Sequence, residues 1–103
     1  MKYPLLHDFF LGFIRIHILF HASQSPVYGT ALMQELARHG YRIGPGTLYP
    51  ILHSLEKKGF LTSQKMVVQG KMRRYYAITA DGRDALQQGQ AKVKELVKEI
   101  IEE

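Results

Sequence analysis

The 103-residue sequence contains no cysteine and no tryptophan. Without cysteine, the chain cannot form disulfides, use a catalytic thiol or build a cysteine-rich zinc site. Its longest apolar stretch, positions 5–20, is interrupted by two histidines, an aspartate and an arginine, so it falls short of the roughly 18 residues of a membrane span. No signal-peptide pattern is present. We therefore expect a cytoplasmic protein that does not contact a membrane.

Acidic residues are almost missing from the middle third of the chain. Residues 38–76 contain eight Lys or Arg residues against one acid, Glu56, which gives this block a net charge of +7 within a chain of net charge +5. Residues 1–37 are neutral overall, and residues 77–103 carry −2. A block of one sign favours an anionic partner, with nucleic acid first, over the alternative of an ordinary solvated surface.

The sequence also lacks the common catalytic and cofactor motifs, including GxSxG and the phosphate-binding glycine loops. Asp81 and Asp84 belong to the first turn of a predicted helix, where acidic side chains are stabilising without any catalytic role. His17 and His21 lie one helical turn apart, but the sequence places no third ligand beside them, and protein zinc sites use three or four. We therefore predict no enzyme activity, no metal site and no cofactor.

What the sequence does contain is a clear order of secondary structure. Hydrophobic periodicity predicts helices at about residues 5–21, 27–38, 45–58 and 80–102, and β-branched and aromatic residues predict strands at 60–68 and 73–78 with a loop at 69–72. The boundary signals are Ser25 and Thr79 as N-caps, Pro26 as a first helical residue, and Gly40 and Gly59 as stops.

This pattern is a mainly α fold with a small β-hairpin. Two helices that are joined tightly and followed by a basic hairpin are the parts of a winged helix-turn-helix. We assign residues 1–78 to a winged helix-turn-helix DNA-binding domain and residues 79–103 to a C-terminal dimerisation helix.

The third predicted helix has one apolar and one open face. Its four leucine and isoleucine residues at 48, 51, 52 and 55 fall within about 100° of arc and form the core side. The opposite side carries a glycine, a proline, a histidine and a lysine, and no Arg, Asn or Gln to read base edges bidentately. We therefore expect backbone and shape recognition to dominate. The residues predicted to contact DNA here are Thr47, Tyr49, Pro50, His53 and Lys57.

The predicted hairpin is strongly basic. Lys65, Lys71, Arg73 and Arg74 fall within ten residues, and a wing with such side chains lies over phosphates or enters the minor groove. We predict DNA contacts from the last three. The alternative is an edge hairpin whose charges only prevent aggregation.

The first and last helices predict a dimer. The first helix is apolar on nearly every side, which a small monomer cannot bury, and the last helix repeats apolar residues every seven positions. We predict that the last helix packs on the first helix of a partner, through Phe9, Phe13, Leu86, Val93, Leu96, Val97 and Ile100.

Several stretches of the sequence together resemble the PadR family of regulators, in its short form with one C-terminal helix. They are residues 28–29 (YG), 46–50 (GTLYP), 55–59 (LEKKG), 73–76 (RRYY) and 78–82 (ITADG), of which GTLYP is the most specific. The resemblance implies a homodimeric transcription factor that binds double-stranded DNA, usually as a repressor, and leaves any small-molecule effector unidentified. The alternative is a winged-helix module that binds protein instead of DNA.

Overall fold

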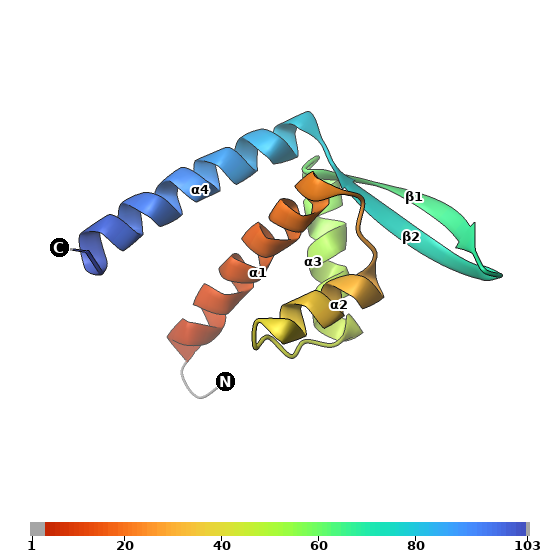
Figure 1. Ribbon diagram of the computed structural model, residues 1–103, viewed down its shortest axis with the longest axis horizontal. Coiled ribbons are helices and arrows are strands. Elements are labelled where there is room, and N and C mark those ends of the chain that lie inside the picture. Colours follow the sequence, from red (N-terminus) through yellow and green to blue (C-terminus); the bar gives the residue numbers. More distant parts are fainter. Residues whose placement is uncertain (1–3, 103) are drawn as a thin grey trace.

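The computed structural model describes residues 4–102 as four helices and one β-hairpin (Figure 1). The predicted units 1–78 and 79–103 also include residues 1–3 and 103, which lie outside this description. The elements are α1 (Pro4–Gln24), α2 (Gly29–Arg38), α3 (Pro45–Lys57), β1 (Leu61–Val68), β2 (Lys71–Ile78) and α4 (Ala80–Ile100). Their order confirms the predicted winged helix-turn-helix followed by one long helix.

The hydrophobic core lies where the first three helices meet the base of the hairpin. The apolar side chains predicted for the inner face of α3 are all buried, which confirms the helical phase derived from the sequence. Tyr76 of β2 is fully buried among them. The buried apolar residues are Ile14, Ile18, Leu19, Ala22, Leu32, Leu36, Leu48, Ile51, Leu52, Leu55, Leu61, Tyr76 and Leu86.

Helix α1 is only partly covered by the rest of the chain. By length and hydropathy its segment Leu5–Gln24 is apolar enough to cross a membrane, which the predicted interruptions at positions 5–20 had argued against. Its Ile14 and Ile18 belong to the core of the domain, however, so packing inside this core accounts for part of the apolarity. The predicted burial on all sides is not achieved within one chain, because Phe9 and Phe20 are about half exposed.

Helix α2 begins two residues later than predicted, and Ser25 is not its N-cap. Val27 instead pairs with Tyr76 as an isolated bridge, with backbone N–O distances of 2.9 and 2.7 Å. These hydrogen bonds hold residue 27 in an extended conformation, so the helix begins only after Tyr28, the observed N-cap residue. A pairing with a strand 49 residues further along the chain thus outweighed a local capping signal.

The hairpin turn is tighter than predicted. Only Gln69 and Gly70 lie between the strands, and their φ angles are +51° and +77°. Two consecutive positive φ values give a turn of the type I′ kind, whose twist matches that of the flanking strands. Lys71 and Met72, predicted as loop, therefore pair with Val68 and Val67 and begin β2.

Helix α4 begins at the predicted cap and then leaves the domain. The Thr79 hydroxyl accepts a 3.0 Å hydrogen bond from the backbone N–H of Gly82, and Leu86 reaches the core. Beyond Leu86, no described residue of this helix is buried, and the helix ends at Ile100 instead of near residue 102. Figure 1 shows its C-terminal half extending away from the other helices.

Candidate nucleic-acid interface

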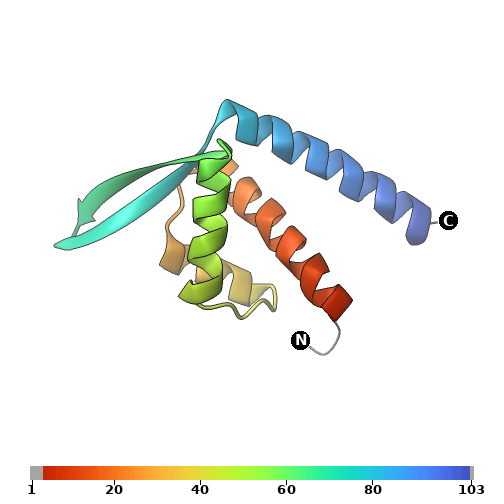
Figure 2. The ribbon, with the colours of Figure 1, turned by 180° about the vertical axis from the view of Figure 1, so that it is seen from behind.

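The outward side of α3 is open over its whole length. The residues predicted for this face, Thr47, Pro50, His53 and Lys57, are all exposed. Figure 2 shows α3 in front of the other helices, with the hairpin projecting from the end where α3 finishes. The structure therefore presents an unobstructed helix beside a projecting wing, which is the arrangement that a groove-binding helix requires.

The start of α3 adds a favourable electrostatic field to this face. Gly44 is the N-cap residue, no side chain caps the helix, and its first turn contains no acidic residue. The unpaired N–H groups of a helix N-terminus carry a partial positive charge and bind anions well. The proline at position 50 lies inside the helix without interrupting it, as predicted.

Tyr49 occupies a different position from the rest of the predicted set. Its side chain is half-buried and lies against the first residue of α2. A Cβ added at Gly29 would overlap the Tyr49 hydroxyl oxygen, and it would lie 2.6 Å from the ring carbon Cζ. Only glycine at position 29 allows the Tyr49 hydroxyl to lie this close to the start of α2, and a larger residue there would displace the tyrosine side chain.

A shallow recess opens beside this contact, between the start of α2, α3 and β2. The structure brings three predicted residues together there, Tyr49, Arg73 and Arg74, and leaves Lys71 near the hairpin tip. Sequence reasoning missed the residues that α2 contributes. Tyr28 and Gly29 are part of the family-like pattern, but nothing local assigns them a role. The residues lining the recess are Tyr28, Gly29, Thr30, Tyr49, Met72, Arg73 and Arg74.

The two wing arginines are held by different contacts. Successive strand residues point to opposite faces of the sheet, so Arg73 and Arg74 diverge. The Arg73 guanidinium carbon lies 4.4 Å from the centre of the Tyr28 ring, within the range of a cation–π interaction. Arg74 Nη1 donates to Ser63 Oγ at 3.0 Å, and Ser63 Oγ donates to Glu56 Oε2 at 2.6 Å. The single acid of the basic block thus fixes the wing to the end of α3.

Basic side chains also face each other across the hairpin. Lys65 lies directly opposite Arg74 in the strand register, and directly opposed like charges are destabilising. An anion between them would relieve this repulsion. Lys71 is exposed on the other face, close to the turn. Both faces of the wing therefore present positive charge.

Comparison with known proteins decides the family. The model of the PadR-like family of transcriptional regulators matches residues 18–88, which is more than half of the chain. The chain belongs to this family. As a PadR-like protein it belongs with transcriptional regulators, as the sequence resemblance implied.

Relatives agree with this assignment over nearly the whole chain. The chain is 47% identical to the transcriptional regulator Rv3488 of Mycobacterium tuberculosis over 93% of its own length and 90% of that protein. Among solved structures, it resembles a PadR family transcriptional regulator from Eggerthella lenta, with 32% identity, a TM-score of 0.80 and coverage of 91% and 83% of the two chains. A PadR-like transcription factor from Bacteroides fragilis gives 27% identity, a TM-score of 0.80 and coverage of 93% and 94%.

Proposed function

We propose that this PadR-like chain is a cytoplasmic, homodimeric repressor that binds double-stranded DNA. In this proposal α3 enters the major groove, and the β1–β2 wing lies over the neighbouring backbone. The observation that carries the proposal is the arginine-lined recess beside the open face of α3.

The recess has the chemistry of a phosphate site. Its lining includes two arginines together with Tyr28, Thr30 and Tyr49, three residues that carry hydroxyl groups. It also lies at the N-terminus of α2, whose first turn contains no acidic residue and whose N-cap side chain makes no capping hydrogen bond. Arginine, hydroxyl groups and a helix N-terminus are the groups that bind DNA phosphates in known complexes. A phosphate placed here would fix the register of α3 in the groove.

The protein should discriminate only modestly between DNA sequences. On the exposed side of α3, only Thr47, His53 and Pro50 are placed to meet base edges, and none offers the bidentate pairing of Arg, Asn or Gln. We therefore expect the ratio of specific to nonspecific affinity to be around a thousandfold, at the low end for DNA-binding proteins.

The dimer is supported by apolar surface on the two outer helices. On α1, Phe9 is 55% exposed and its ring stacks on that of Phe13 at a centroid distance of 5.7 Å. On α4, Leu96 and Ile100 are 47% and 65% exposed. Val93 is partly exposed, and Val97 is half-buried. A long helix with exposed apolar side chains in its outer half is stabilised when a second chain packs on it.

The test is a titration of the full chain with its own upstream region and with random duplex at several salt concentrations. We count about three phosphate contacts per protomer among five basic side chains, hence about six per dimer, so log K should fall against log salt with a slope of about −5. The five side chains are Lys57, Lys65, Lys71, Arg73 and Arg74.

A matched pair of lysine variants locates the contact. Lys71→Ala should weaken binding to both duplexes alike and flatten the slope by about one to two units, one for each protomer. Lys98→Ala removes an exposed lysine from the last turn of α4 and should leave the slope unchanged. A reporter driven by the upstream region should be less active when the protein is present. A slope near zero would refute the proposal and favour a protein-binding module.

A further inference from the structure

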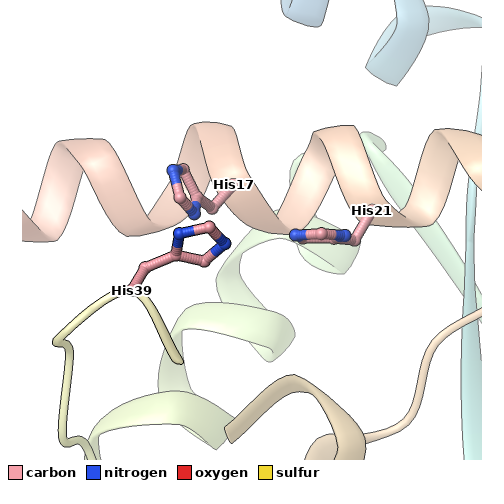
Figure 3. A group of neighbouring side chains, drawn as sticks. All are labelled: His17, His21 and His39. Carbon is pink, nitrogen blue, oxygen red and sulfur yellow. The ribbon is translucent and has the colours of Figure 1, made fainter. Parts of the chain in front are cut away.

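Three histidine side chains from two separate elements meet beside α4. His17 and His21 lie one turn apart on α1, and His39 reaches them from the C-cap position of α2 (Figure 3). One ring nitrogen from each lies within 4.8 Å of the other two. The ring centroids of His17 and His39 are 5.2 Å apart. The fold thus supplies the third imidazole that the sequence did not place.

This arrangement is costly for the apoprotein. The Nδ1 atom of His17 is buried and has no hydrogen-bond partner among the described residues. An unsatisfied buried nitrogen costs the free energy of its lost hydration. The neighbouring carboxylate of Glu35 lies 3.7 Å from His21 Nε2, and its other oxygen is 2.9 Å from Arg38. A ligand bound between the three imidazoles would offset this cost.

We propose that His17, His21 and His39 bind one divalent transition-metal ion of the zinc type. Imidazole nitrogens are the preferred protein ligands of Zn²⁺, Co²⁺ and Ni²⁺. Two histidines spaced by four on a helix present their nitrogens on one side, as in known zinc motifs. Three protein ligands with an open fourth position also form a complete site when a carboxylate or water fills that position. Water is the fourth ligand proposed here, because the Glu35 carboxylate is already paired with Arg38 at 2.9 Å.

The geometry needs only small side-chain movements. Metal–nitrogen bonds of about 2.0–2.1 Å in a tetrahedral site place the ligand nitrogens roughly 3.3 Å apart. The observed spacing of up to 4.8 Å would have to shorten by up to about 1.5 Å on binding, and the exposed side chain of His39 can contribute to this movement. The recess beside the cluster is walled by Ile16, Phe20, Leu86 and Gln90 from α1 and α4.

A metal ion here would join elements that the hydrophobic core connects only weakly. His39 follows the last residue of α2 and precedes the connection to α3, whereas the other two ligands belong to α1. Occupancy would therefore fix the end of α2 against α1, close to the residues of α4 that line the recess. The site itself requires neither DNA nor a dimer, so its test is independent of the proposed function.

The experiment titrates the full chain, prepared without a polyhistidine tag, with Co²⁺ and then Zn²⁺. We expect one Co²⁺ per chain, with the visible absorption of a tetrahedral ion, and displacement by Zn²⁺. His39→Gln and His21→Gln should each lower the affinity at least about 100-fold, the upper end of the loss caused by mutating even an outer-shell residue. His7→Gln, an exposed histidine on the same helix α1, is the matched control and should bind as the parent does.

A second measurement needs no variant. In a histidine ring ¹H–¹⁵N spectrum of the parent chain, Zn²⁺ should shift the signals of three of the five histidines and leave His7 and His53 unchanged. Failure of the parent to bind, equal binding by His39→Gln, or shifts at His7 or His53 would each overturn the proposal.

Discussion

Replacing Gly29 with alanine tests the close contact between the start of α2 and the Tyr49 side chain of α3. The added Cβ would lie 2.6 Å from Cζ and 3.0 Å from Cε1 of Tyr49 and would overlap its hydroxyl. Overpacking of this kind costs about 1–3 kcal/mol. The higher helix propensity of alanine offsets up to about 1 kcal/mol of this loss of stability. We therefore expect Gly29→Ala to lower the free energy of unfolding by about 1–2 kcal/mol.

The cost should disappear when the tyrosine ring is removed. In a Tyr49→Ala background the three atoms nearest to the new methyl group are gone, so Gly29→Ala should be neutral or stabilising by up to about 1 kcal/mol. The coupling between the two sites is then about 1–3 kcal/mol, in the usual range for residues in contact. Gly12→Ala is the control, because a Cβ at that position meets nothing within 4 Å.

Urea denaturation of the four proteins of the cycle measures these values, with unchanged m-values as the condition for comparing them. DNA titration adds a functional readout. Displacing Tyr49 from the recess should weaken binding at least about tenfold, the value of one charge-assisted hydrogen bond, and Gly12→Ala should not. If Gly29→Ala has the same cost with and without the Tyr49 ring, the close contact does not determine how the helices dock.

Three further predictions follow from burial and charge. Tyr76→Phe should be neutral or stabilising by about 1 kcal/mol in urea denaturation, because the buried Tyr76 hydroxyl finds no hydrogen-bond partner within residues 4–102. Burial raises the pKa of Tyr76 above 10.0. The unfolded chain therefore loses the Tyr76 phenol proton at a lower pH than the folded chain does, and the free energy of unfolding of the parent should fall as pH rises above about 10. The same dependence of stability on alkaline pH in the parent and in Tyr76→Phe would contradict this. Val93→Asp with Leu96→Asp should give monomeric or insoluble protein, and sedimentation that finds the intact chain monomeric at micromolar concentration would contradict the dimer. Leu52→Asp should leave no cooperative unfolding transition, because it buries a charge at a fully buried position of α3, and a native circular dichroism spectrum would contradict this.

The sequence by itself determined the features that depend on near neighbours. The inner face of α3 follows from the 3.6-residue period, because side chains three and four positions apart share one side of a helix. The start of α4 follows from Thr79, whose hydroxyl accepts from an N–H three residues away. Even the exposure of His53 and Lys57 follows from the same helical phase. Each of these involves one element and atoms within a turn or two of each other.

Only the tertiary structure decided the features that join distant segments. Ser25 and Pro26 carry a sound helix-start signal, yet hydrogen bonds between Val27 and Tyr76 hold the chain extended there, because two backbone hydrogen bonds to a strand outweigh a local cap. The closeness of Gly29 and Tyr49, and of His39 to the histidines of α1, likewise depends on how the helices cross. No periodicity within a segment encodes such contacts, because their geometry is set by the packing of the whole core.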